Sequence, residues 1–218
     1  MTTHQQIPAV YHHRIGDIAV TALSDGTLER SLDLLRSITV EESEKLFRDA
    51  FRPGVVISVN AFVLRIGDRH WNDDAAMARG TERQKKFFFQ QAREQMAPYR
   101  DRMRTFRQGE VLPGVTAIPC HGHTPGHTAY LVESGGRQLL VWGDMVHIPE
   151  VQIPRPEVTI DFDTDPQAAA ASRRRIFDMA ASERLLVTGM HLHFPGFGHL
   201  TRRGDGFAFT PQAWQQVL

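Results

Sequence analysis

The sequence predicts an α/β fold in a single domain that spans residues 1–218. The length is sufficient for one sizeable core and leaves little room for a second. Segments with the β-branched content or the alternation of strands occur in both halves of the chain, and segments with helical spacing separate them. Neither repeats nor low-complexity linkers divide the chain.

The first part of the chain is predicted to form strands around one helix. Residues 15–23 alternate partly between apolar and polar side chains and end in a Ser-Asp-Gly turn signal at residues 24–26. Residues 55–66 are rich in β-branched side chains, as is typical of a strand. Between these segments Thr39 is a suitable helix N-cap, and Glu42, three residues later, completes a capping box.

The rest of the chain continues with helices and strands. From Asn72 to about Phe106 the spacing is helical, with a break at Pro98. Gly135 and Gly136 mark a hairpin turn. The strands expected here are residues 115–118, 128–133, 138–142 and 184–188, and a helix over residues 165–181 precedes the last of them.

The charge balance argues for a small-molecule substrate. Lys plus Arg and Asp plus Glu both number 25, so no net field attracts nucleic acid or an anionic membrane. No apolar run approaches the roughly 20 residues that cross a bilayer. The single cysteine, Cys120, cannot form an internal disulfide, and residues 1–8 lack the apolar segment of a secretory signal, so we expect a cytoplasmic location.

Three of the predicted strands end in the same way, with a glycine-containing turn followed by a side chain that can bind a metal. These side chains are His123, Asp144 and His191. Strand ends at one edge of a sheet can aim side chains at a common point. Two imidazoles and a carboxylate suit zinc, and also manganese, iron or cobalt. Each residue alone is more often an ordinary hydrogen-bonded turn residue than a metal ligand, so the prediction depends on the recurrence.

These segments resemble motifs of the metallo-β-lactamase superfamily. Residues 122–127 (GHTPGH), with the strand that follows, are similar to its third histidine motif. Residues 142–144 (WGD) are similar to its bridging aspartate motif, and residues 189–191 (GMH) to its last histidine motif. Residues 22–27 and 191–199 narrow the resemblance to the branch that includes methyl parathion hydrolase and quorum-quenching lactonases.

The resemblance implies an αβ/βα sandwich with its metals at one edge of the sheets. By the family pattern His123 binds one metal, His191 binds the other and Asp144 bridges them, with zinc as the expected cation. His127 is expected to be a structural hydrogen-bonding residue of its loop. The implied activity is that of a hydrolase in which a metal-bound hydroxide attacks a lactone, ester or phosphotriester.

Three further residues are candidates for the substrate pocket. His147 lies three residues after the bridging aspartate, a position that faces substrate in some lactonases of the family, and we expect it to be partly exposed and to polarise or protonate the substrate. The alternative is a histidine that supports a metal ligand from behind or lies at the surface. Phe194 and Phe197 are expected to form the floor of an apolar pocket, and simple packing is the alternative.

The defining His-x-His-x-Asp-His signature of the superfamily is absent from the sequence. In the family pattern it lies between the strand at residues 61–66 and a helix that this chain begins near Trp71, so the junction of His70 and Trp71 indicates a deletion. The predicted fold is therefore an incomplete sandwich. Its exposed apolar surface would make the chain marginally stable, re-paired or homodimeric. The competing functional hypothesis is a non-catalytic or truncated relative whose three remaining ligands hold at most one weakly bound metal.

Overall fold

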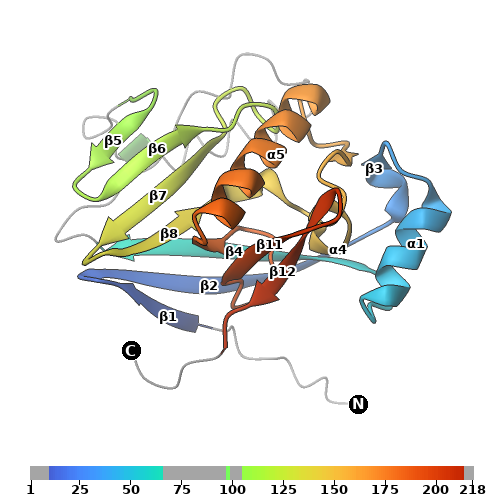
Figure 1. Ribbon diagram of the computed structural model, residues 1–218, viewed down its shortest axis with the longest axis horizontal. Helices are drawn as coiled ribbons and strands as arrows, with labels where there is room; N and C mark the ends of the chain where they lie inside the picture. Colours follow the sequence, from blue (N-terminus) through green and yellow to red (C-terminus); the bar gives the residue numbers. More distant parts are fainter. Residues whose placement is uncertain (1–9, 66–96, 99–104, 214–218) are drawn as a thin grey trace.

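The computed structural model describes residues 10–65, 97–98 and 105–213 (Figure 1). Its strands form a three-stranded sheet in the order β1-β2-β4, a seven-stranded sheet in the order β12-β11-β10-β8-β7-β6-β5, and a small pair of β3 with β9. This mixture of helices and sheets confirms the predicted α/β class. The junction of His70 and Trp71, and most of the helix expected between Asn72 and Phe106, lie outside the described residues.

The three-stranded sheet is antiparallel and consists of β1 (Val10–Ile15), β2 (Ile18–Arg30) and β4 (Val55–Arg65). The turn predicted at residues 24–26 is wrong, because β2 continues through it. A β-bulge between Ser24 and Gly26, where Gly26 has a φ of 111°, absorbs the extra residue instead. Both halves of β2 find partners along β4, so the Ser-Asp-Gly sequence bends the strand without ending it.

A small helical layer extends from one end of this sheet. Helix α1 (Val40–Asp49) has the predicted capping box between Thr39 and Glu42. It packs near the short helices η1 (Leu32–Leu34) and α4 (Pro149–Gln152). The adjoining pair of strands is β3 (Leu35–Arg36) with β9 (Thr159–Ile160).

The seven-stranded sheet contains the strands predicted for the second half of the chain. Gly135 and Gly136 form the expected hairpin turn between β7 and β8, with φ values of 57° and 69°. The strands are β5 (Gly109–Leu112), β6 (Val115–Pro119), β7 (Thr128–Ser134), β8 (Arg137–Val141), β10 (Leu186–Thr188), β11 (Gly198–Arg203) and β12 (Gly206–Pro211). Helix α5 (Pro166–Ser182), capped by Asp165, precedes β10 and confirms the expected helix.

The core lies on both faces of the seven-stranded sheet. Helix α5 covers one face, where Phe177 packs on Trp142 with ring centroids 5.4 Å apart (Figure 1). The three-stranded sheet covers the other face, where Val20 and Leu139 are fully buried. These layers bury the apolar residues that alternate along the strands.

The strand directions explain where the candidate metal-binding residues meet. Strand β8 is parallel to β10, and β6 and β8 are both antiparallel to the intervening β7. The carboxyl ends of β6, β8 and β10 therefore open onto the same edge of the sheet. The turns that follow these three strands carry His123, Asp144 and His191.

Strand β4 has a single strand partner, β2, among the described residues. Val63 of β4 is 41 % exposed. The deletion at the junction of His70 and Trp71 stays a prediction, because this junction lies outside the described residues. No helix in the described part of the chain is both long and apolar enough to cross a membrane.

Candidate metal centre

His123, Asp144 and His191 come together at the edge of the seven-stranded sheet. The Nε2 atom of His123 lies 3.7 Å from Oδ2 of Asp144, and Nε2 of His191 lies 3.4 Å from Oδ1 of the same carboxylate. Each histidine therefore faces a different oxygen of Asp144. Although the three residues are far apart in the sequence, their turns aim them at one place, as the strand ends predicted.

This donor set suits divalent cations. Two ligands of a tetrahedral ion with bonds of about 2.1 Å are separated by about 3.4 Å, close to the two nitrogen to oxygen distances at Asp144. Within the described ranges, no group of three His, Cys, Asp or Glu side chains is arranged to hold one ion. The described residues thus offer one ligand pair on each side of a shared carboxylate, fewer than the three or four ligands that zinc takes. This shortfall agrees with the missing signature.

The loop that carries His191 is fixed by strand β4. The Nδ1 atom of His191 donates to the carbonyl of Ser58 at 2.7 Å, which leaves Nε2 directed to Asp144. The backbone N–H of Asn60 donates to the carbonyl of Met190 at 2.8 Å, and its side-chain amide donates to the carbonyl of Leu192 at 2.7 Å. The edge of β4 therefore holds the imidazole in its orientation.

A buried carboxylate orients His123 in the same way. The Nδ1 atom of His123 lies 3.1 Å from Oδ1 of Asp163, a residue that no motif in the sequence identified. Asp163 is buried beside Arg173 at 3.7 Å. The Arg173 guanidinium also donates to the carbonyls of Met145, Pro156 and Val158. Such a carboxylate behind a histidine fixes its tautomer and strengthens it as a metal ligand.

His127 has the structural role that the resemblance implies. Its Nδ1 atom donates to the carbonyl of Cys120 at 3.1 Å, and its Nε2 atom accepts the backbone N–H of Asp144 at 3.1 Å. Burial, followed by the nearby His123, lowers the pKa of His127, which keeps the ring neutral as these two bonds require. Gly143, which directly precedes Asp144, has a φ of 63°, and a Cβ there would lie 2.7 Å from the His127 ring.

His147 is only 4 % exposed, so the expectation of partial exposure is wrong. Its ring lies between the two metal-facing histidines, with centroids 4.8 Å from His123 and 4.6 Å from His191. The backbone N–H of His147 is held by the side chain of Gln152, whereas its Nδ1 atom is buried and has no partner in the described part of the chain. Burial and the two neighbouring imidazoles move the pKa of His147 well below its ordinary value.

The Asp144 carboxylate stays ionised and favours the protonated form of His191. Although burial alone raises the pKa of Asp144, the contacts with His191, His147 and His123 hold it well below its usual range. Conversely, burial lowers the pKa of His191, but the hydrogen bond and charge of Asp144 outweigh this and raise it. Asp144 thus favours a proton on Nε2 of His191, and a metal that binds this nitrogen would have to replace the proton.

The two phenylalanines expected to floor the pocket pack against the core between the sheets. Phe197 is 2 % exposed, and its ring lies 5.6 Å from that of Tyr11 and 5.1 Å from that of His13. Phe194 is partly buried against the same cluster. The aromatic residue beside the metal group is instead Phe162, which is 41 % exposed and lies 5.8 Å from the His147 ring.

An ion-pair cluster beside the His191 loop was also missed by sequence reasoning. The Nε2 atom of His193 donates to Glu150 at 2.5 Å, and Nε of Arg52 lies 3.1 Å from the same carboxylate oxygen. The remaining ring nitrogen of His193 lies 3.4 Å from the hydroxyl of Ser58. Although burial raises the pKa of Glu150, its partner His193 outweighs this and lowers it. The cluster ties the loop to α4 and β4.

Several solved structures are similar to this one. The hydrolase AbOPH, described as a member of the beta lactamase superfamily, has a TM-score of 0.84 and 23% identity over 97% of this chain and 100% of its own. AidC, a dizinc quorum-quenching lactonase in complex with a product, N-hexanoyl-L-homoserine, has a TM-score of 0.80 and 16% identity over 97% of this chain and 100% of its own. A probable metal-dependent hydrolase from Staphylococcus aureus has a TM-score of 0.65 and 14% identity over 94% and 100%.

At these identities the structural similarity shows the fold and leaves the substrate open. No curated protein sequence matches the chain. The family model of the metallo-beta-lactamase superfamily matches residues 45–184, which is more than half of the chain and includes His123 and Asp144. Together with the shared fold, this match shows that the chain belongs to the metallo-beta-lactamase superfamily.

Proposed function

We propose that the chain is a metal-dependent hydrolase of a lactone, ester or phosphotriester. The observation that supports this most directly is the position of Asp144 between the Nε2 atoms of His123 and His191. A divalent cation bound at such a group lowers the pKa of its water to about 7 and so supplies a nucleophile near neutral pH. Asp144 together with His123, His191 or both would hold the cation, while Asp163 and the Ser58 carbonyl fix the two rings.

His147 is proposed to contact the substrate. Its lowered pKa keeps the imidazole neutral at neutral pH, so the ring has one N–H to donate. Its Nδ1 atom has no hydrogen-bond partner among the described residues, and both metal-facing rings lie beside it. We therefore assign to His147 the polarisation of a substrate oxygen. The exposed face of Phe162, next to His147, would cover an apolar part of the substrate.

A lactone is the substrate class to test first. The structurally similar AidC is a lactonase, and the sequence motifs resemble the branch that contains such enzymes. A γ-lactone, an aryl ester and an aryl phosphotriester should be assayed side by side with zinc, manganese and cobalt. Turnover of any one of them with a bound metal supports the proposal.

The second candidate is a non-catalytic relative with one weak metal site. It is favoured by the absence of the His-x-His-x-Asp-His signature and of any three-ligand group in the described part of the chain. Metal content and turnover of Asp144→Asn separate the two candidates, with Asp161→Asn as the matched control because Asp161 is an exposed partner of Arg36. Tightly bound metal with turnover that only Asp144→Asn abolishes excludes the second candidate. Weak metal binding with no turnover in the unmodified protein excludes the first.

A further inference from the structure

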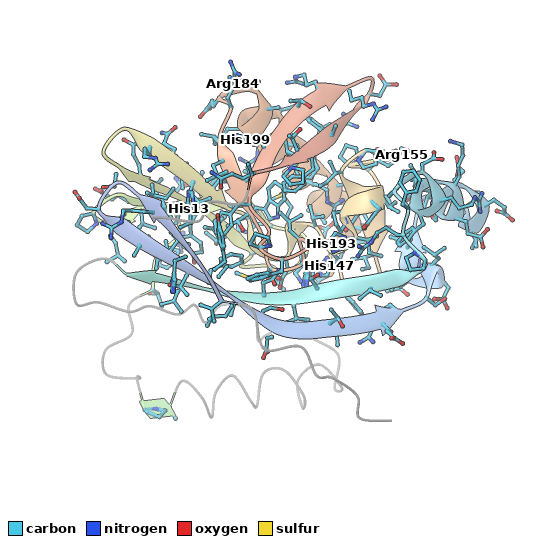
Figure 2. All side chains as sticks on the ribbon, turned by 90° about the horizontal axis from the view of Figure 1, so that it is seen from below. His13, His147, Arg155, Arg184, His193 and His199 are labelled. Carbon is cyan, nitrogen blue, oxygen red and sulfur yellow. The ribbon has the colours of Figure 1, made fainter. Side chains whose placement is uncertain are left out.

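A polar cavity of about 310 Å³ lies between the two sheets, away from the metal group. It is bordered by β1 of the small sheet and by β8, β10 and β11 of the large one. Figure 2 shows its residues His13, His199 and Arg184 on a different part of the molecule from His147 and His193. The polar side chains used below are those of His13, Arg137, Glu183, Arg184, His199 and Gln212.

Two buried polar atoms at this cavity lack a partner. His13 is 2 % exposed and its Nε2 atom has no hydrogen bond in the described part of the chain. The Oε1 atom of Gln212 is buried and equally unpartnered there. Buried polar groups almost always have partners because leaving one unpaired costs free energy. Both residues line this one cavity, so a single polar ligand is a candidate partner for both atoms.

The charges around the cavity favour an anion. Arg137 and Arg184 are exposed at its rim, and neither has an ion pair with a described residue. Glu183 is the one carboxylate among the lining residues, so two guanidinium groups face one carboxylate within the lining. Glu133 lies just outside it, where its carboxylate accepts a hydrogen bond from the lining residue Gln138. Arg184 has a φ of 55°, an unusual backbone conformation for a residue with a side chain. His199 donates from Nδ1 to the carbonyl of Leu185 at 2.9 Å, which leaves Nε2 as a further polar atom.

We propose that this cavity binds a small hydroxycarboxylate. Its carboxylate would lie between Arg137 and Arg184, and its hydroxyl groups would donate to Gln212 Oε1 and bond His13 Nε2. The volume lies at the lower end of the roughly 300 to 1,000 Å³ typical of ligand pockets, which suits a molecule of the size of a sugar acid. This site is separate from the proposed hydrolytic centre and does not depend on it.

Calorimetric titration with three probes tests the ligand chemistry. Gluconate carries both the carboxylate and the hydroxyl groups, gluconamide lacks the charge, and hexanoate lacks the hydroxyl groups. Gluconate should bind, and the other two should bind about tenfold more weakly or not at all, since each loses a hydrogen-bonded or charged contact. Absence of gluconate binding, or equal binding of hexanoate, overturns the proposal.

Matched variants test the location of binding. His13→Phe keeps a ring against Phe197 and removes the polar atoms, while Arg184→Gln removes one guanidinium. Each substitution should weaken the binding of gluconate about tenfold. The controls His12→Phe, on the opposite side of β1, and Arg203→Gln, an exposed residue of β11, should leave it unchanged. If His13→Phe does not fold, Arg184→Gln alone decides. Binding that survives the decisive variants is located elsewhere, for example at a bound metal, and contradicts the proposal.

Discussion

At the residue scale, each metal-facing histidine has its Nδ1 atom engaged by an oxygen from a distant segment. Asp163 accepts from His123, and the Ser58 carbonyl accepts from His191. Neither oxygen belongs to a recognisable motif, because hydrogen bonds between distant segments leave no local pattern. The metal-binding candidates themselves were predictable, since glycine-containing turns after three strands carry them.

Replacing Asp163 by Asn should weaken metal binding about 10- to 100-fold, the usual effect of losing the carboxylate behind a ligating histidine. The substitution also removes the negative charge beside Arg173, so some loss of stability is expected. Zinc affinity can be measured by competition with a chromophoric chelator. Asp161→Asn, at an exposed site, is the control. An unchanged zinc affinity in folded Asp163→Asn would rule out an orienting role.

The buried His13 should make stability depend on pH. Burial, followed by the charge of Arg137, lowers its pKa in the folded protein, so the unfolded state binds a proton more readily. The contribution of His13 to stability is therefore full well above pH 6.5 and falls as the pH drops through this unfolded-state value. Urea unfolding should be measured at pH 7.5 and 5.5. The free energy of unfolding should fall less between these pH values in His13→Phe than in the unmodified protein or in His12→Phe. Equal losses in all three would contradict this assignment.

At the scale of elements, the features that depend on neighbouring residues in the sequence were predicted correctly. The capping box of α1 and the glycine hairpin between β7 and β8 depend on neighbouring residues, and both are present. The end of β2 was misplaced because pairing with β4, a tertiary interaction, overrides the turn signal and leaves a bulge. The position of the His123 loop against α5 also depends on tertiary packing, which no local sequence pattern reveals.

Gly122 is the residue that lets this loop approach α5. It has a φ of 135°, and a Cβ there would lie 2.0 Å from the backbone nitrogen of Ala169. Gly122→Ala should therefore lower the free energy of unfolding by more than about 3 kcal/mol, from strain and overpacking together, and should displace His123. Gly204→Ala is a matched control, because Gly204 has a φ of 58° and open space around it. Its cost should be about 1 kcal/mol. Equal unfolding curves for the two variants would contradict the packing argument.

At the scale of the whole molecule, β6, β8 and β10 run in the same direction, so the three motifs that follow them lie at the same edge of the sheet. The family resemblance predicted this sandwich from motifs spread along the chain. The cavity at His13 was not predictable, because its lining comes from both sheets and from the segment before β10. Of the residues expected in a substrate pocket, Phe197 packs in the core, whereas Phe162, which was not expected there, lies beside His147.

A cation bound at Asp144 and at one or both histidines joins separate segments of the chain and should stabilise the entire fold. Zinc at about 100 times its dissociation constant should add about 2.7 kcal/mol to the free energy of unfolding. Thermal unfolding with zinc and with a chelator should show a higher midpoint for the zinc-loaded protein, and Asp144→Asn should lose most of this difference. The same shift in that variant would indicate that zinc binds elsewhere.

The most direct test of the metal centre is anomalous diffraction at the zinc absorption edge from zinc-soaked crystals. The expected result is an anomalous peak about 2.0 to 2.2 Å from an oxygen of Asp144 and from Nε2 of His123, of His191 or of both. Two peaks bridged by Asp144 would match the family arrangement. No peak at this carboxylate, with zinc bound only at other sites, would contradict the proposed metal-dependent hydrolase.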